Sequence, residues 1–370
     1  MNAVDLVIQG GIDINGNSLE VAITNGIITQ IGPKLDVEAK EVISLEENTY
    51  ISAGWIDSHV HCYEAMNLYY DFPDEIGVLA GVTTVVDAGS SGEANIKDFY
   101  ERTRKAKTNV YALMNISKNG IVTQDELADL RNINNDINEL RIRELEDFIV
   151  GIKARMSKTV VGDNDTIPLK MAKELQHRFE DLPLMVHIGS RPPSLEDIFE
   201  ICEAGDIITH CYNGKENGIV SPEGKIKSFV WDAYHKGLLF DIGHGTDSFN
   251  FKVAHQAFDE GVLCNTISSD IYYRNRINGP VYDLATTMEK GLEMGLSLEQ
   301  VIEMVTVHPA RMYHLENKGE LLPGKDADLS LFKIIEAKKT LKDSNGNESE
   351  INQTIVPVMA VVGGKPWKVV

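Results

Sequence analysis

Eight short apolar runs, each followed by a longer stretch with helical spacing of its apolar residues, constrain the fold more than any other feature. Several runs are apolar without alternation, as expected for strands that are covered on both faces. The runs are Gly54–His59, Thr83–Asp87, Val110–Ile116, Ile149–Ala154, Leu184–Ile188, Ile207–Cys211, Leu238–Ile242 and Asn265–Ser269. The helices expected after them are Asp74–Ala80, Glu93–Ala106, Gln124–Phe148, Ile167–Phe179, Ser194–Ala204, Lys225–Lys236, Ser248–Glu260 and Val281–Met294. This alternation predicts an α/β fold, a closed (β/α)8 TIM barrel over residues 51–315.

The residues on either side of the barrel region are β-like. Residues 1–50 and 316–370 are therefore expected to pair in one small β domain, a β-sandwich built from both chain ends. Asn25-Gly26 predicts a hairpin turn, and Pro357 predicts an edge position or a bend in its strand. The polar stretch 339–350 predicts a mobile loop. The strands expected are Asp5–Gln9, Ser18–Thr24, Gly26–Ile31, Leu329–Phe332, Thr354–Val356 and Val358–Val362.

The charge balance excludes two classes of partner. Fifty-six acidic residues against 35 basic ones give the 370-residue chain a net charge of −21. Such a surface repels phosphate backbones and anionic lipid headgroups, so neither nucleic acid nor a membrane is expected as a partner. The cysteines are scattered, without a CxxC pair, and the first residues lack a basic and apolar leader pattern. A reduced, cytoplasmic protein is the expectation.

Histidines gather where a barrel of this kind carries out chemistry, at the C-terminal ends of its strands. His59 and His61 follow the first run, and residues i and i+2 of an extended segment project to the same face. Both imidazoles can therefore reach one cation, and neutral imidazole is a good zinc ligand. His187, His210 and His244 end the fifth, sixth and seventh runs.

Two further residues stand at notable places. Asp270 ends the eighth run, where a carboxylate can ligate a metal and accept a proton, or simply cap a helix that begins at Ile271. Lys153 lies inside the fourth run, although lysine is rarely buried without a partner. An ammonium group has no lone pair for a metal, so the plain alternative is a side chain that extends to solvent.

These residues together resemble the amidohydrolase superfamily of metal-dependent hydrolases. The order HxH, Lys, His, His, Asp on the first, fourth, fifth, sixth and eighth strands carries the resemblance, together with the closing segment 319–329. Three local segments resemble a dihydroorotase-related, deacetylase-type branch whose members are often named dihydroorotase or adenine deaminase. Those segments are Gly151–Met156, Thr209–Gly214 and Phe240–Gly245.

The resemblance implies a site with two divalent metal ions, most often Zn²⁺. His59 and His61 would hold one ion with Asp270, and His187 and His210 would hold the other. Lys153, carboxylated by carbon dioxide to a carbamate, would bridge both. A hydroxide shared by the ions would attack the substrate, and Asp270 would carry the proton to the leaving group.

The function expected is hydrolysis of an acyl amide or acetyl ester, a deacetylase-like reaction on a small carboxylate-bearing molecule. Arg155, Tyr212, Asn213 and His244 are the expected substrate contacts, since each lies at or near the end of a strand. A cyclic amidase and an adenine deaminase are the alternatives on the same site. A non-catalytic assembly protein on the same fold is disfavoured, because such relatives often lose metal ligands and this chain keeps all six. Whether the chain forms a homo-oligomer is left open.

Overall fold

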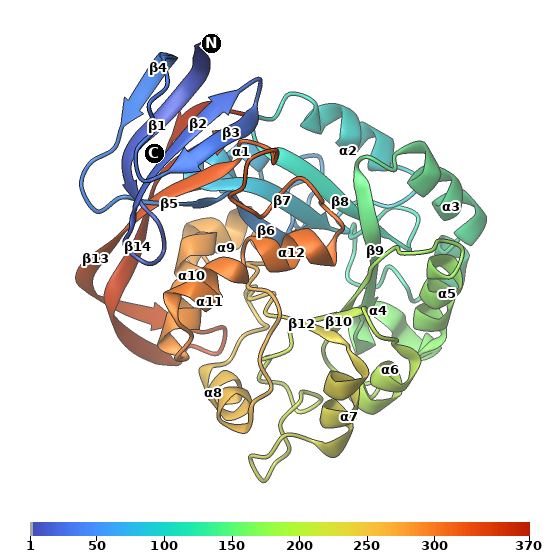
Figure 1. Ribbon diagram of the computed structural model, residues 1–370. Coiled ribbons are helices and arrows are strands. Elements are labelled where there is room, and N and C mark those ends of the chain that lie inside the picture. Colours follow the sequence, from blue (N-terminus) through green and yellow to red (C-terminus); the bar gives the residue numbers. More distant parts are fainter. Residues whose placement is uncertain (1–2) are drawn as a thin grey trace.

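The computed structural model describes residues 3–370 and contains two sheets. Seven strands form the first sheet, in which every neighbouring pair is parallel and follows the order of the chain. The sheet is curled, and helices lie around its outside (Figure 1). Its strands are β6 (Trp55–Val60), β7 (Val82–Ala88), β8 (Asn109–Asn115), β9 (Ile149–Met156), β10 (Leu184–Ile188), β11 (Ile207–Thr209) and β12 (Leu239–Asp241). The prediction of an α/β fold with a parallel sheet is confirmed.

The eighth apolar run does not form a regular strand in the described chain. It nevertheless bonds to both edges of the curled sheet. Thr266 pairs in parallel with Asp241 of β12, and Ile271 pairs in parallel with Val60 of β6. The backbone N–H of Asp270 also donates to the carbonyl of His59 at 2.7 Å. Asp270 has a φ of 49°, which interrupts the extended conformation that a ladder requires.

The helices that follow the strands begin and end at the residues that usually cap helices. Ser194, Asn250 and Asp283 each accept a backbone N–H of the first turn, and Gly237 and Gly261 end two helices in the left-handed conformation. The longer helices are α2 (Ile96–Thr103), α3 (Asn135–Glu144), α5 (Ile167–Gln176), α6 (Leu195–Ile201), α7 (Ser228–Lys236), α8 (Phe251–Glu260) and α10 (Leu284–Glu293). The shorter ones are α1 (Pro73–Ile76), α4 (Lys158–Val161), α9 (Tyr273–Asn278), α11 (Leu298–Glu303) and α12 (Val307–Met312).

The predicted helix over 124–148 is wrong in its first half. Only α3 is α-helical there, after a single 3₁₀ turn at Leu130–Asn132. The side chain of Asp129 accepts the N–H of Arg131, and Asn134 caps α3. These local bonds offer the backbone an alternative to a continuous helix.

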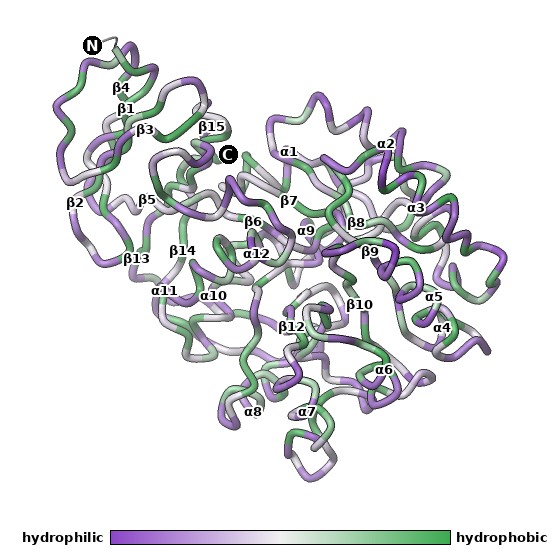
Figure 2. The backbone as a smooth tube through the Cα atoms, turned by 45° about the vertical axis from the view of Figure 1, so that its right-hand side comes forward, coloured by the Kyte–Doolittle hydropathy of each residue, from purple (hydrophilic) through white to green (hydrophobic). Residues whose placement is uncertain are grey.

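Strands from both chain ends form the second sheet, with eight strands in mixed directions. The N- and C-terminal strands lie side by side in Figure 1, and hydrophobic and hydrophilic residues alternate along them in Figure 2. The order is β15-β14-β13-β5-β1-β2-β3, with β4 beside β1. The bounds are β1 (Val4–Ile12), β2 (Ser18–Thr24), β3 (Ile27–Gly32), β4 (Ala39–Ser44), β5 (Tyr50–Ala53), β13 (Leu329–Lys342), β14 (Glu348–Val362) and β15 (Lys365–Lys368). The strands form one sheet in the hydrogen-bond pattern, so the expected β-sandwich is not confirmed.

A single residue separates the two sheets where the chain first passes between them. Gly54 lies between β5 and β6, and its N–H donates to the carbonyl of Asp328 at 2.8 Å. A Cβ atom at this position would lie 2.2 Å from Oγ1 of Thr83 on β7, so only glycine fits without a shift of that side chain. The terminal sheet is thus joined directly to the strand that carries His59.

The mobile loop predicted at 339–350 is instead the end of a long hairpin. β13 and β14 are paired up to Lys342 and Glu348, and only 343–347 form the turn. The carboxylate of Asp343 accepts the backbone N–H groups of Asn345 and Asn347 and so orders the turn. Pro357 lies at a shift in the register of this hairpin, which agrees with the predicted bend.

The Asn25-Gly26 turn is confirmed, because both residues have positive φ, 54° and 76°, between β2 and β3. The four cysteines are buried and none forms a disulfide. Within residues 3–370, no helix combines the length and the apolar character needed to cross a bilayer.

Candidate active site

A cavity of about 440 Å³ opens at the C-terminal ends of the parallel strands. All six residues predicted as metal ligands line it, although they are far apart in the sequence. The lining residues are His59, His61, Tyr69, Gln124, Lys153, Arg155, Ser157, Thr159, Val160, His187, Ser190, His210, Lys215, Thr246, Asp247, Ser248, Asp270 and Tyr272. The structure therefore brings all six predicted metal ligands to one cavity.

The side chains converge closely around Asp270. Its Oδ1 lies 3.4 Å from Nε2 of His59 and 3.2 Å from Nε2 of His61. His59, His210 and Asp270 each offer one ligand atom within 4.8 Å of the others. The ring of His187 lies 4.4 Å from that of His210, centroid to centroid. Several ligand atoms thus face one small volume, as a metal centre requires.

The backbone turns sharply at two of these residues. His210 follows β11 and Asp270 follows the eighth segment, with φ values of 69° and 49°. Non-glycine residues adopt the left-handed region infrequently, and such strain concentrates at functional sites. Here it marks the points at which two segments leave the sheet and present a side chain to the cavity.

The histidine rings are held in the form that binds a metal. Nδ1 of His59 lies 2.8 Å from Oγ1 of Thr209, and that hydroxyl donates to Asp241 at 2.7 Å. The hydroxyl proton is committed to Asp241, so the ring N–H of His59 is the donor in the first bond. Nδ1 of His61 lies 2.8 Å from the hydroxyl of Ser90. Both rings are thus left with Nε2 toward the cavity, a pattern usual for metal-bound histidine.

The hydrogen-bond partner of His210 also determines which of its ring nitrogens carries the proton. Its Nδ1 lies 2.6 Å from the carbonyl oxygen of Gly243, which can only accept, so Nδ1 carries the proton and Nε2 a lone pair. Burial lowers the pKa of His210 to about 4. Burial also holds the pKa values of His59 and His187 well below the ordinary range. Neutral imidazoles are the ligand form, so the residues present fit a divalent cation.

Lys153 does not extend to solvent, because only 1% of the residue is exposed. Its Nζ lies 3.2 Å from Nε2 of His59 and 3.1 Å from the sulfur of Met185. Burial lowers the pKa of Lys153 to about 7. A neutral amine is nucleophilic, which is the state that capture of carbon dioxide requires.

Arg155 lines the cavity, as predicted, but its charge is already compensated. Its Nε lies 2.7 Å from Oε1 of Glu126, and both side chains are buried. Its Nη2 donates to Gln124 at 3.1 Å. The pair holds the 124–126 loop against β9. We infer from this pair that Arg155 stabilises the wall of the cavity.

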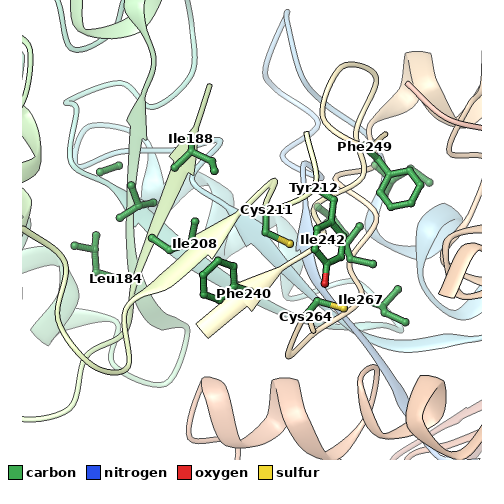
Figure 3. Close-up of a cluster of buried hydrophobic side chains, with 14 of the residues drawn as sticks. Leu184, Ile188, Ile208, Cys211, Tyr212, Phe240, Ile242, Phe249, Cys264 and Ile267 are labelled. Carbon is green, nitrogen blue, oxygen red and sulfur yellow. The ribbon is translucent and has the colours of Figure 1, made fainter. Parts of the chain in front are cut away.

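Three other predicted substrate contacts lie outside the cavity. Tyr212 is fully buried in an apolar cluster beside Cys211, Ile242 and Phe249 (Figure 3), and its hydroxyl donates to the carbonyl of Val262 at 2.9 Å. Its large apolar ring packs into the hydrophobic core, so this geometry adds no support to its prediction as a substrate contact.

Asn213 and His244 are also structural. The amide of Asn213 donates to the carbonyl of His210 and accepts the N–H of Lys215. His244 is buried, with Nδ1 2.8 Å from the carbonyl of Gly245 and Nε2 2.6 Å from Nζ of Lys290. Neither residue is among those that line the cavity, so this geometry adds no support to their prediction as substrate contacts, which stays a prediction.

Several residues that line the cavity were not predicted from the sequence. Ser157 shares the parity of Lys153 and Arg155 on and after β9, so alternation could have found it. Tyr69 and Tyr272 lie edge to face, with centroids 4.9 Å apart. Tyr69 lies in a loop without periodicity, so no sequence pattern pointed to it.

Lys215 is the cavity cation with the most accessible charge. Its Nζ lies 2.7 Å from Asp247, and the two side chains are 30% and 74% exposed. Exposed ion pairs are worth little, about 0–1 kcal/mol, so Lys215 can exchange this partner for a ligand anion.

Comparison with known proteins agrees with this geometry. A family described as a deacetylase-like composite domain matches residues 321–367. A deacetylase of Enterococcus faecalis is 55% identical over 362 residues, which are 98% of each chain.

Two solved structures are also similar. One, described as an adenine deaminase, has a TM-score of 0.97 and 54% identity, and the match covers 99% of this chain and 100% of that one. The other, described as a dihydroorotase, has a TM-score of 0.90 and 32% identity, with 98% and 97% covered. These relatives bear different activity names, so the substrate has to be argued from the site.

Proposed function

Because this chain belongs to the deacetylase-type branch of the amidohydrolase superfamily, and is a hydrolytic enzyme of that superfamily, we propose that it cleaves an acyl amide or acetyl ester of a small carboxylate-bearing molecule. The observation that carries the proposal is the convergence of four histidines, Lys153 and Asp270 on one cavity. We also propose that the curled sheet closes into a complete (β/α)8 barrel, in which residues 265–271 are the irregular eighth strand.

We further propose that the cavity holds two divalent ions, Zn²⁺ in the simplest case. His59 and His61 would hold one of them with Asp270, and His187 and His210 the other. Lys153, as a carbamate, would contribute an oxygen to each. When bound, such ions acidify water and polarise the carbonyl to be cleaved.

Asp270 is the residue best placed to move a proton. Its side chain is 16% exposed and lines the cavity, so it reaches both the interior and an entering substrate. A carboxylate here accepts a proton from the attacking water and passes it to the leaving nitrogen or oxygen. Two buried carboxylates near the site have other partners: Asp57 accepts the N–H and the hydroxyl of Ser269, and Asp241 accepts the hydroxyls of Thr209 and Thr266.

The charge of the cavity supports a substrate with a carboxylate. Lys153 is assigned to the metals, and the charge of Arg155 is compensated by Glu126. Lys215 keeps an exchangeable charge at the mouth. A substrate carboxylate would take the place of Asp247 beside Lys215, while its acyl group reaches the metals.

The test is a screen of the zinc-loaded protein against N-acetyl amino acids, acetyl α-hydroxy acids, dihydroorotate and adenine. Turnover of an acetylated acid, with much weaker turnover of the matched neutral amide or ester, supports the proposal. Turnover of dihydroorotate as the best substrate would assign a cyclic amidase instead. Turnover of adenine alone overturns the proposal.

A further inference from the structure

We propose that the tip of the β13–β14 hairpin, residues 343–347, is a positioning element of the active site, and that Ser344 acts through the segment 244–251, of which residues 246–248 line the cavity. This inference rests on the proposed function, since it concerns the wall of the same cavity. The hairpin belongs to the terminal sheet, and it runs along α10 (Figure 1). Its tip thereby reaches a segment that is about 95 residues away in the sequence.

Ser344 makes four polar contacts with that segment. Its hydroxyl lies 3.3 Å from the carbonyl of His244 and 3.1 Å from that of Gly245. The same hydroxyl oxygen accepts the N–H of Phe249 at 3.1 Å. The backbone of Ser344 also donates to the carbonyl of Phe249 at 3.0 Å. One residue thus spans both ends of the loop that contains Thr246, Asp247 and Ser248.

Neighbouring residues of the tip extend this contact. Oδ2 of Asp343 accepts the N–H of Phe251, the first residue of α8, at 3.1 Å. Oδ1 of Asn345 accepts from the amide of Asn250 at 2.8 Å. Asp343 is only 2% exposed, so its bonds lie in a largely dry contact and are not replaced easily by water.

The segment held in this way forms part of the cavity. Thr246, Asp247 and Ser248 line it, and Asp247 is the partner of Lys215. The hydroxyl of Thr246 lies 2.9 Å from that of Tyr272, which follows the neighbouring eighth segment. A Cβ atom on Gly245 would lie 2.3 Å from Oδ2 of Asp270, so this backbone also packs directly against the cavity carboxylate.

A second turn in the same sheet shows that the contact is not needed to form the turn. Residues 13–17 have the pattern Asp-x-Asn-Gly-Asn, and so do residues 343–347. Asp13 accepts the N–H groups of Asn15 and Asn17, as Asp343 does with Asn345 and Asn347. In the first turn Asn15, Gly16 and Asn17 are exposed, and the half-buried Ile14 stands where the second has Ser344. A turn of this pattern therefore forms without the polar contacts that Ser344 makes with segment 244–251.

The experiment compares Ser344→Ala with Ser344→Thr, which keeps the hydroxyl, and with Asp13→Asn in the exposed turn. Hydrogen exchange of 244–251 is measured in the zinc-loaded protein, and kcat and KM are measured with the acetylated acid that the wild type turns over fastest. We expect Ser344→Ala to speed exchange in this segment at least tenfold and to raise KM about fivefold, with kcat within twofold. Ser344→Thr should restore both values, and Asp13→Asn should change neither.

A loss of thermal stability in Ser344→Ala with unchanged exchange and unchanged KM overturns the proposal, because the tip would then be merely structural. If the wild type hydrolyses no acetylated acid, the proposed function fails. The exchange measurement still decides the role of Ser344, since it requires no substrate.

Discussion

Nδ1 of His210 lies 2.6 Å from the carbonyl oxygen of Gly243. The bond fixes the proton on Nδ1 and leaves Nε2 free for a metal. Gly243 can approach this closely because it has no side chain. A Cβ atom there would lie 2.2 Å from Oγ1 of Thr209 and 2.9 Å from Nδ1 of His210.

Gly243→Ala should therefore disturb two ligand histidines at once, since Thr209 supports His59. Loss of such supporting bonds typically costs about 10–100-fold in metal affinity or activity. Competitive zinc titration with a chelator measures the effect. Gly224→Ala is the matched control, because Gly224 also has positive φ but no atom within 4 Å of the added Cβ. Equal effects in both variants would attribute the loss to backbone strain alone.

Lys153→Ala should lose one or both metals and nearly all activity. Without the carbamate, the two ions would lose the anion that Lys153 supplies, and their mutual repulsion would be less well compensated. Metal analysis should fall from two ions per chain, and a short added carboxylic acid with zinc should restore part of the turnover. Full metal content in the unrescued variant would remove Lys153 from the centre.

Asp270→Asn should retain most of the metal but reduce kcat by about 10²–10⁴-fold, the usual contribution of a positioned proton carrier. An amide can occupy the same space but cannot take up and release the proton. Steady-state kinetics with parallel metal analysis separates these effects. A kcat near that of the wild type would assign the proton transfer to another group.

Lys215→Met should raise KM about tenfold for carboxylate substrates, which corresponds to about 1.4 kcal/mol. The matched neutral amide should be unaffected, because it has no charge for Lys215 to bind. Lys225→Met is the control, since Lys225 is a 73% exposed lysine on the same connection that does not line the cavity. Equal losses for charged and neutral substrates would argue against recognition of a carboxylate.

The buried Lys290 is expected to make the free energy of unfolding depend on pH. It is buried beside His244, and burial lowers its pKa to about 7 from an ordinary value of 10.5. Between these values the unfolded chain binds a proton that the folded chain does not, so the free energy of unfolding rises with pH. The slope from this group is at most about 1.4 kcal/mol per pH unit, and it vanishes below about pH 7.

Denaturant unfolding of the wild type and of Lys290→Met at pH 7 and pH 9.5 tests this dependence. The wild type should gain stability relative to the variant at the higher pH. A difference that is the same at both values would show that Lys290 is charged in the folded protein.

The main elements of the fold and the gathering of the histidines and Asp270 could be predicted from local pattern, whereas the role of Lys153 was implied only by the resemblance to the amidohydrolase superfamily. His187 and His210 end apolar runs, and in a parallel sheet such ends meet at one edge. His59 and His61 are two apart on an extended segment, which places both rings on one face.

Long-range contacts decided where prediction failed. Within the helix predicted from Gln124 onward, Glu126 forms a buried pair with Arg155 of β9, in addition to the local bonds that Asp129 and Asn134 make with the backbone. The polar stretch around Asp343 resembles a mobile loop, yet it is ordered by its own carboxylate and by contacts with 244–251. Tyr212 directly follows Cys211 and lies near a ligand in sequence, but its ring fills the core. No local pattern encodes these partners.

The single glycine between β5 and β6 has an evolutionary consequence. Since Gly54 alone separates the strand paired with β13 from the strand that carries His59 and leads to His61, this passage has no spacer at which the two sheets could be cut and recombined. A chimera of two relatives with a crossover near residue 50 would take β1 to β4 from one parent, and β5, the first two histidines and β13 from the other. Such a crossover divides the terminal sheet itself, because β1 pairs with both β4 and β5, so the strands of that sheet are expected to be inherited together.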